Sequence, residues 1–216
     1  MFWLCPLQVL GQANVTEERV LAESGSGENW FDQGGNFRGE HYSPLDQVND
    51  GNVSELGLSW TTDLPMKDGT PTTPIVVDGV VYLGGASSIV VAIDAKTGQD
   101  LWMYEADMES VFSKEACEWC SWISRANRGV AVWDGRVFVT AADCRLIALD
   151  AKTGEQQWAV RTCDTEAGYS ISDSPYVGGG KIYLGNAGSE SRENNRGYVD
   201  AFAPNTCNLI LPNYIT

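Results

Sequence analysis

The sequence has few basic residues for its length. Its 216 residues include 14 lysines and arginines against 29 aspartates and glutamates, which gives a formal net charge of −15. Because a nucleic-acid backbone and an anionic membrane surface both repel such a chain, neither is an expected partner. No stretch is long and apolar enough to cross a bilayer, so no membrane span is expected. The acidic surface is interpreted first as a solubility feature.

Histidine is also scarce, since His41 is the only one in the sequence. The pair Cys117-x-x-Cys120 has the spacing of half a zinc site, but its other two ligands would have to come from His41 or later cysteines. A thioredoxin-like redox pair would need a helix start that the strand pattern does not offer. A structural or cofactor-facing disulfide is the preferred interpretation, and a zinc site stays open as the alternative.

What the sequence does contain is a repeat. Val90–Trp102 reads V-V-A-I-D-A-K-T-G-Q-D-L-W, and Leu146–Trp158 reads L-I-A-L-D-A-K-T-G-E-Q-Q-W. In each copy alternating apolar residues predict a strand, a glycine permits the positive φ of a tight turn, and a second strand brings in a tryptophan. Repeats of this length, with short strands and one tryptophan each, are typical of a β-propeller.

The sequence therefore predicts an all-β fold, a β-propeller of four-stranded antiparallel blades. Tight hairpins in two blades are predicted at Asp78-Gly79 and Asp134-Gly135, because each pair lies between β-branched runs. A degenerate third copy of the repeat begins at Tyr198, and in this copy Cys207 replaces the turn glycine. About three blades fit in this length, fewer than the roughly four to eight that close a ring. We therefore expect this chain to be part of a longer protein.

Three segments are predicted along the chain. Residues 1–13 are expected to be a truncated signal peptide, because a short apolar run ends in a small-x-small pattern but lacks a basic start. A lipoprotein cysteine at Cys5 is the alternative, and both interpretations place the mature chain outside the cytoplasm. Residues 14–65 are predicted to form an N-terminal arm, with a strand around Trp60 that completes a last blade. Residues 66–216 are predicted to form three blades, the third incomplete.

Cys144 and Cys163 are predicted to form a disulfide. They are symmetric about the Thr153-Gly154 turn, which places them opposite each other on paired antiparallel strands. An exported protein meets the oxidising conditions in which such a bond forms. A register slip of one residue is expected to defeat it.

Several ordered motifs resemble the pyrroloquinoline-quinone-dependent alcohol dehydrogenases. They are S-P-L-D-Q-V-N from Ser43, N-R-G-V-A-V-W from Asn127, R-L-I-A-L-D-A-K-T-G from Arg145, G-N-A-G-S-E from Gly185 and R-G-Y-V-D-A-F from Arg196. The resemblance extends over nearly the whole chain from Trp30 to Tyr198. It implies an eight-bladed propeller with pyrroloquinoline quinone (PQQ) and a calcium ion on its axis, of which this chain is an N-terminal fragment.

The resemblance also implies a set of site residues. Arg128 matches an arginine that contacts the quinone oxygens, and Ser172 stands where the family has a threonine whose hydroxyl binds the cofactor. Glu190 matches the calcium-binding glutamate. The residues assigned to the cofactor are Arg128, Ser172, Gly188, Ser189, Cys117 and Cys120, and the residue assigned to the metal is Glu190.

Three positions depart from the family pattern. Pro71 falls where the family commonly has a cofactor-contacting glutamate, and Ala187 falls where a serine or glycine is usual. The family's adjacent cysteine pair, which lies over the quinone, is represented here by Cys117 and Cys120 with extra residues around them.

The function implied by the resemblance is oxidation of a primary or other small alcohol by hydride transfer to PQQ. The metal is calcium, with a lanthanide as the alternative. The catalytic aspartate belongs to later blades, so no catalytic residue is expected here and the chain alone is expected to be inactive. A cytochrome-type electron acceptor and a periplasmic location follow. The alternative function is a non-catalytic periplasmic propeller scaffold that binds protein partners, but Arg128 and Glu190 favour the dehydrogenase.

Overall fold

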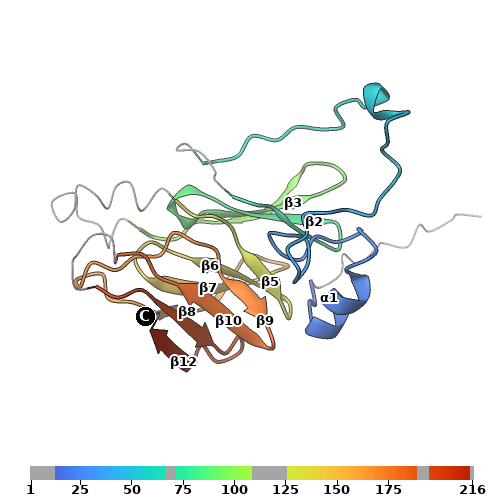
Figure 1. Ribbon diagram of the computed structural model, residues 1–216. Coiled ribbons are helices and arrows are strands. Elements are labelled where there is room, and N and C mark those ends of the chain that lie inside the picture. The colour runs from blue at the N-terminus through green and yellow to red at the C-terminus, as the bar shows by residue number, and fades with distance from the viewer. Residues whose placement is uncertain (1–12, 67–71, 109–125, 189–194, 215–216) are drawn as a thin grey trace, which may run out of the picture.

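The fold is built almost entirely of β-strands. The computed structural model describes residues 13–66, 72–108, 126–188 and 195–214. The strands of these segments form three four-stranded antiparallel sheets, stacked one after another in chain order (Figure 1). The predicted all-β fold with four-stranded blades is confirmed. Within these segments no helix is long and apolar enough to cross a membrane.

Each blade follows the chain in order from its inner to its outer strand. The first blade contains β1 (Ile75–Val77), β2 (Val80–Gly84), β3 (Val90–Asp94) and β4 (Asp100–Tyr104). The second contains β5 (Ala131–Trp133), β6 (Arg136–Thr140), β7 (Arg145–Asp150) and β8 (Gln156–Arg161). The third contains β9 (Tyr176–Gly178), β10 (Lys181–Gly185), β11 (Tyr198–Phe202) and β12 (Leu209–Tyr214). The helical elements are α1 (Glu17–Glu23) and the 3₁₀ helices η1 (Val53–Glu55) and η2 (Ala86–Ser88).

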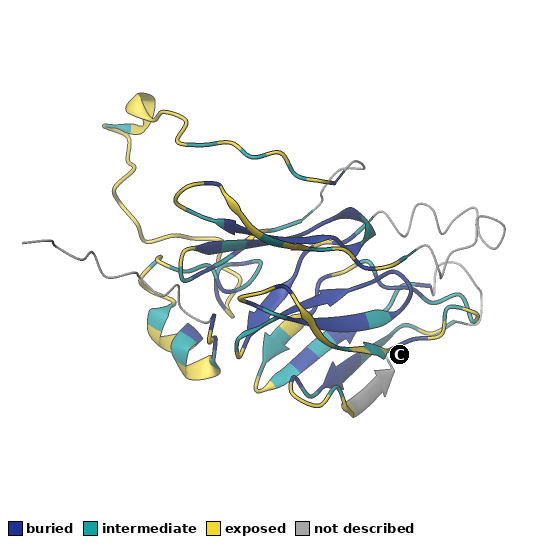
Figure 2. Cartoon of the chain, turned by 180° about the vertical axis from the view of Figure 1, so that it is seen from behind, coloured by how far each residue is buried: buried dark blue, intermediate teal, exposed yellow. Residues whose placement is uncertain are grey.

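The second blade forms the centre of the hydrophobic core because it lies between the other two. Its strand β7 is buried on both faces over four consecutive residues, whereas β8 at the outer edge alternates exposed and half-buried positions. Phe138, Leu146 and Ile147 are fully buried in this layer. Figure 2 shows the same gradient, with buried inner strands and an exposed N-terminal arm.

The hairpin turns confirm what the sequence predicts at the Asp-Gly pairs. Asp78 and Gly79 have φ of 53° and 76°, and Asp134 and Gly135 have φ of 49° and 73°. Two consecutive residues with positive φ make the type of turn whose twist matches that of the paired strands. The outer turns of the first two blades place Gly98 at φ 73° and Gly154 at φ 74°, as the repeat predicts.

A tryptophan from each preceding segment packs on the outer turn of the next blade. The indole N–H of Trp102 in the first blade donates to the carbonyl of Ala151 in the second at 3.0 Å. A Cβ added at Gly154 would lie 2.6 Å from the Trp102 ring, so only glycine permits this contact. Trp60 makes the equivalent contact with the first blade, because its N–H donates to the Ala95 carbonyl at 3.1 Å.

The third blade has all four strands, so the expectation of an incomplete third blade is wrong. Its outer turn forms without glycine because Cys207 adopts φ 52°, and its N–H donates to the Ala203 carbonyl at 3.1 Å. The backbone of β12 then pairs with β11. The tryptophan contact is lost here, since the Trp158 indole nitrogen is buried without a hydrogen-bond partner among the described residues.

Replacing Cys207 by glycine is expected to restore the missing contact. Gly154 donates to Asp150 as Cys207 donates to Ala203, so the carbonyl equivalent to that of Ala151 is the carbonyl of Pro204. Without a Cβ at this turn, the Trp158 N–H can approach it, and the unfavourable φ of a non-glycine residue is relieved. We expect C207G to stabilise the fold by about 1 kcal/mol, a rise of roughly 2–4 °C in Tm.

Thermal unfolding of C207G beside the reverse change, G154C, measures this effect. G154C is expected to destabilise the fold, because it adds a side chain where the Trp102 ring lies. A Tm of C207G equal to or below that of the unmodified chain would contradict the interpretation.

The N-terminal arm joins the first two blades at their hairpin turns. The α1 helix begins after Thr16, whose side-chain oxygen accepts from the Arg19 backbone N–H at 3.2 Å. Arg19 makes an ion pair with Asp78 of the β1–β2 turn and lies 5.6 Å from the centroid of the Phe31 ring. The carbonyl of buried Ala13 accepts from Gly135 in the β5–β6 turn at 3.1 Å. The predicted signal peptide covers residues 1–12, which lie outside the described residues, and Ala13, which is part of the fold; it stays a prediction.

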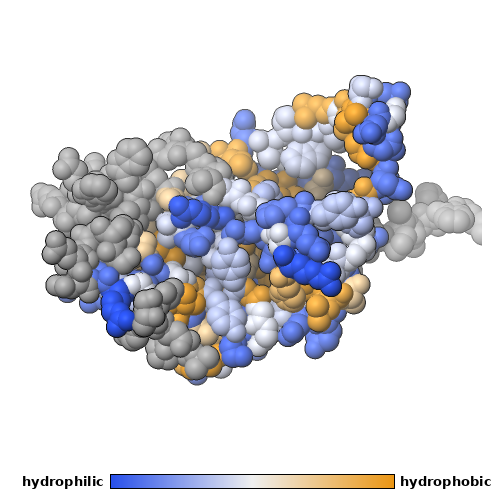
Figure 3. Space-filling model, viewed as in Figure 1, coloured by the Kyte–Doolittle hydropathy of each residue, from blue (hydrophilic) through white to orange (hydrophobic). Residues whose placement is uncertain are grey.

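The stretch of the arm around η1 stands away from the blades (Figure 1), whereas Trp60 further along contacts the first blade. The predicted strand over residues 52–65 is not formed: η1 occupies its start, and the residues after η1 pair with no described strand. Apolar side chains are exposed along this segment (Figure 3), including Leu58 at 82%, Leu56 at 62% and Val53 at 52%. That this segment completes a last blade stays a prediction.

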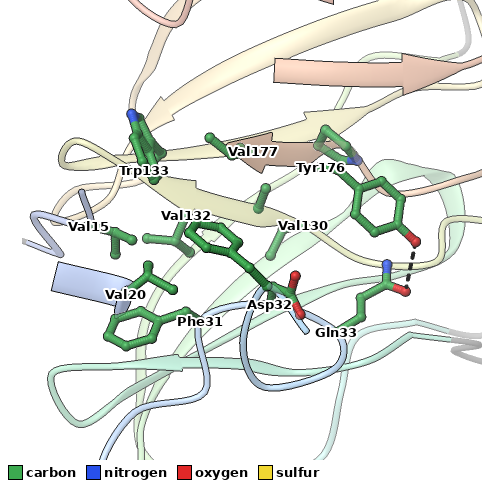
Figure 4. Close-up of a pocket in the computed structure, with 13 residues that line it drawn as sticks. Val15, Val20, Phe31, Asp32, Gln33, Val130, Val132, Trp133, Tyr176 and Val177 are labelled. Carbon is green, nitrogen blue, oxygen red and sulfur yellow. Dashed lines mark hydrogen bonds between the residues drawn. The ribbon is translucent and has the colours of Figure 1, made fainter. Parts of the chain in front are cut away.

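A small pocket lies between the arm and the inner strands β5 and β9 (Figure 4). Valine side chains from both strands line it, and Asp32 of the arm faces it. Burial raises the pKa of Asp32, although the Gly34 N–H bond at 2.7 Å and the nearby His41 oppose this shift. The charged form of Asp32 is therefore disfavoured by the folded state.

Replacing Asp32 by asparagine is expected to stabilise the fold at neutral pH. Because the folded-state pKa lies above the unfolded value, proton binding favours the folded chain at low pH, and that contribution is lost as pH rises through the folded pKa. D32N keeps an acceptor for the Gly34 N–H and cannot ionise. The difference in free energy of unfolding between D32N and the unmodified chain should therefore shrink as pH falls and Asp32 becomes protonated. Urea unfolding from pH 4 to 8 measures this, with D164N as the control, since exposed Asp164 bonds the N–H two residues on in the same way. A pH-independent difference would contradict the prediction.

Candidate functional site

The segments that lead into the three inner strands meet side by side. The Thr73 N–H, before β1, donates to the Arg128 carbonyl at 3.4 Å, and the Arg128 N–H, before β5, donates to the Ser172 carbonyl at 3.2 Å. Thr73 and Gly129 also form a parallel bridge. The fold thus brings Arg128 of the second blade and Ser172 of the third to one place at the inner ends of adjacent blades.

The guanidinium of Arg128 is fixed by Ser172. Its Nη1 donates to the Ser172 hydroxyl at 2.8 Å and to the Ser172 carbonyl at 3.3 Å. Arg128 is exposed, and among the described residues no carboxylate lies within ion-pair distance of it. A structural ion pair within those residues therefore does not explain Arg128.

Gly188 lies at the same end of the third blade. It follows Ala187, which forms an antiparallel bridge with Ser170. The Ala187 N–H donates to the Ser170 carbonyl at 2.8 Å, and the Ser170 N–H donates to the Ala187 carbonyl at 3.0 Å. Its φ is 125°, and a Cβ added there would lie 2.5 Å from the Gly168 carbonyl oxygen. Glycine is required by both the backbone conformation and the close approach of the neighbouring chain. Ala187, a departure from the family pattern, keeps this bridge through its backbone.

The remaining predicted site residues lie outside the described residues, and their roles stay predictions: Pro71, Cys117, Cys120, Ser189 and Glu190. Among the described residues no group of three His, Cys, Asp or Glu side chains could hold a metal ion. The predicted metal ligand, Glu190, is thus untested by the structure.

The predicted disulfide between Cys144 and Cys163 is confirmed, with their Cα atoms 5.1 Å apart. The exact opposition of the two residues is wrong by one position. Next to the turn Leu149 pairs with Gln156, so the hairpin is centred earlier than predicted, and the bulge after Ala148 removes only part of that offset. Cys144 lies just outside β7 at φ 71°, and its carbonyl accepts from the Thr162 N–H at 2.7 Å. The disulfide therefore spans the one-residue slip, and it anchors the connection that leads from β8 to Ser172.

Several polar atoms near the inner strand ends of the blades are buried without a hydrogen-bond partner, and they bear on whether an oxygen-rich ligand fits there. The hydroxyls of Thr72 and Ser170 and the side-chain nitrogen of Asn186 are buried and have no hydrogen-bond partner among the described residues. Thr72 precedes Thr73 at the meeting point, and Ser170 lies two residues before Ser172. Such atoms are costly to bury unpaired, so they favour a polar ligand. The cation of Arg128 suits the carboxylates and quinone oxygens of PQQ, and the residues present fit that group.

Sequence reasoning missed Asn127, which lies next to Arg128. The side chain is buried, with 1% of its surface exposed, and both ends of its amide are hydrogen-bonded. The signal was available, because an asparagine two residues before a glycine is typical of a turn in which the side chain caps the backbone.

Three four-stranded blades whose inner strands adjoin are the architecture of a β-propeller. The family model for the β-propeller domain of PQQ glucose, ethanol and alcohol dehydrogenases matches residues 30–210. The chain belongs to this family of PQQ-dependent dehydrogenases.

Individual relatives agree with the family match. The quinohemoprotein alcohol dehydrogenase ADH-IIG of Pseudomonas putida is 42% identical over 195 residues, covering 90% of this chain and 26% of the relative. The 1-butanol dehydrogenase (cytochrome c) of Thauera butanivorans is 42% identical over 180 residues, covering 83% of this chain and 25% of that enzyme. The chain thus spans about a quarter of the length of these relatives.

Solved structures show the same fold. The structure of ADHIIG from Pseudomonas putida superposes with a TM-score of 0.83 at 40% identity, covering 94% of this chain and 29% of that one. A europium-containing methanol dehydrogenase superposes with a TM-score of 0.78 at 29% identity, covering 92% of this chain and 34% of that one.

Proposed function

We propose that this chain forms part of a PQQ-dependent dehydrogenase that oxidises a small alcohol. The observation that carries the proposal is the juxtaposition of Arg128 and Ser172 from adjacent blades, with the guanidinium exposed and without a described carboxylate partner. Family membership supports PQQ as the cofactor. When bound, PQQ supplies the acceptor for the two electrons that leave the alcohol.

The chain's own residues bind and orient the cofactor. Arg128 would hold a quinone oxygen of the cofactor, where its fixed positive charge would stabilise negative charge. The Ser172 hydroxyl accepts from Arg128 at 2.8 Å, and its own O–H is then directed to donate to the ligand. Gly188 lets the backbone turn closely past Gly168 toward Ser189, whose amide is proposed to donate to the cofactor.

Further parts of the proposal concern residues beyond the described segments. Glu190 is proposed as an oxygen ligand for calcium or a lanthanide, and Cys117 and Cys120 are proposed to lie against the cofactor as a disulfide. The general base is proposed to lie in later blades, so this chain supplies no catalytic residue. The exposed arm is proposed to pack on the last blade of an eight-bladed ring, with the segment around Trp60 as its strand.

The substrate class, partner and location follow from the relatives. The name of the butanol dehydrogenase specifies both an alcohol and cytochrome c, so we propose a primary or other small alcohol as substrate and a cytochrome-type electron acceptor. A periplasmic location accords with the confirmed disulfide. The family match favours a dehydrogenase over a protein-binding scaffold.

Cofactor binding and turnover of the purified chain test the proposal separately. We expect the chain to bind PQQ saturably in the presence of Ca²⁺, measured by quenching of tryptophan fluorescence, and R128A to weaken binding by at least about tenfold, or 1.4 kcal/mol. In a dye-linked assay with several alcohols, the chain alone should give no turnover above the cofactor-only blank. Absence of PQQ binding would contradict the proposed function, and turnover would contradict the assignment of catalysis to later blades.

A further inference from the structure

Asn127 is a buried amide whose donor and acceptor are both used. Its Nδ2 donates to the Thr140 carbonyl at the end of β6 at 2.8 Å, and its Oδ1 accepts from the Gly129 N–H at 3.0 Å. The second bond closes a turn whose central residue is Arg128. The first bond ties that turn to the sheet of the second blade.

The first blade closes over the same turn. A Cβ added at Gly84, the last residue of β2, would lie 2.6 Å from Asn127 Oδ1 and 3.1 Å from the carbonyl carbon and oxygen of Gly129. Gly129 itself is buried, and its φ of 142° is one that other residues rarely adopt. Both residues that flank Arg128 are therefore held between two blades, whereas Arg128 is exposed.

Fixing the backbone matters because an arginine side chain has many rotamers. An immobile backbone and one hydrogen bond at the tip leave the guanidinium with a defined position before any ligand arrives, which reduces the entropy lost on binding. Ser172 supplies the bond at the tip from the third blade.

We propose that Asn127 is a positioning residue: it holds the Asn127–Gly129 turn so that the Arg128 guanidinium is preorganised toward a bound anionic oxygen. The inference rests on the proposed function for the identity of that ligand, and on the hydrogen bonds alone for the positioning. Neither Asn127 nor its amide touches the ligand.

Asparagine suits this place better than its nearest alternatives. Aspartate would keep the acceptor for Gly129 but lose the donor for Thr140 and bury a negative charge beside Arg128. Serine can accept from Gly129 in the same kind of turn but is too short to reach Thr140. Alanine would leave both backbone groups unpaired.

The first measurement is the mobility of the Arg128 side chain in the purified chain without cofactor. In a sample labelled with ¹⁵N-arginine, R128K identifies the Arg128 Nε signal, and heteronuclear relaxation reports its order. We expect an ordered signal in the unmodified chain and a mobile one in N127A. N127S should be intermediate, which keeps the test informative if N127A folds poorly by circular dichroism.

A matched control comes from the N-terminal arm. Asn36 is also buried, and its Oδ1 accepts from the backbone N–H two residues on, that of Arg38, at 2.8 Å. N36A removes the same kind of turn bond away from Arg128. It should leave the Arg128 signal ordered, whereas N127A should not.

The second measurement is PQQ affinity by tryptophan quenching with Ca²⁺ present. We expect N127A to weaken binding by about tenfold, and the double variant N127A/R128A to bind no more weakly than R128A, because Asn127 acts only through Arg128. If the unmodified chain binds no PQQ but N127A still frees Arg128, the proposed function fails and the positioning role stands. If folded N127A and N127S both keep Arg128 ordered, or weaken binding further in the R128A background, the positioning role is wrong.

Discussion

Replacing Gly188 by alanine is expected to lower the free energy of unfolding by about 4 kcal/mol. The φ of 125° is strained for any residue with a side chain, and the new Cβ would lie 2.5 Å from the Gly168 carbonyl oxygen and 3.0 Å from the Tyr169 Cα. Backbone strain costs about 1–3 kcal/mol and overpacking a further 1–3 kcal/mol. Because both obstructing atoms belong to the backbone, a side-chain rotation cannot relieve the clash.

Urea unfolding of G188A beside G178A measures this cost. Gly178 is in the same blade, has no positive φ, and has nothing within 4 Å of an added Cβ. G178A should therefore change stability by less than about 1 kcal/mol. Equal stabilities of the two variants would mean that the close approach at Gly188 does not constrain the third blade.

Removing the disulfide with the double change C144A/C163A is expected to destabilise the fold by about 3 kcal/mol. The bond closes a loop of 19 residues, which restricts the unfolded chain more than the folded one. The loss should be measured as a lower urea midpoint under non-reducing conditions. A reductant should destabilise the unmodified chain by a similar amount more than it destabilises C144A/C163A, in which only the proposed Cys117–Cys120 disulfide is left to reduce.

The free cysteine Cys207 provides the control for this change. C207S keeps a side chain of similar size and makes no change to the disulfide, so it should respond to the reductant as the unmodified chain does. If the reductant had no effect on the unmodified chain, the disulfide would not contribute to its stability.

Much of the fold could be predicted because it depends on local chemistry. The Asp-Gly turns and the repeated glycines specify positive φ, and alternating apolar residues specify strands, so the hairpins follow from short segments. The third blade shows the limit of this reasoning. Loss of its glycine predicts a missing turn, but backbone hydrogen bonding is strong enough to hold Cys207 at φ 52°. Likewise a bulge after Ala148 brings Cys144 one position closer to facing Cys163 than a regular hairpin would, which sequence spacing alone cannot show.

Site residues could be predicted from the sequence only where they belong to a family motif. The resemblance identified Arg128 and Ser172, but no spacing rule shows that the guanidinium of one reaches the hydroxyl of the other from the next blade. Asn127 was missed because its importance depends on burial between two blades. A strand around Trp60 would need a partner strand, and this segment pairs with none of the described blades.

The contacts between each tryptophan and the following turn also order events during synthesis. Trp60 finds its acceptor 35 residues further along the chain, and Trp102 finds its acceptor 49 residues further on. At roughly 5–20 residues per second, the ribosome needs about 2–10 seconds to supply the second partner. Each blade therefore leaves the ribosome with its tryptophan exposed, and the blade made next covers it. Between the second and third blades the Trp158 indole nitrogen is also buried, but it forms no such hydrogen bond among the described residues, because Cys207 stands at the turn.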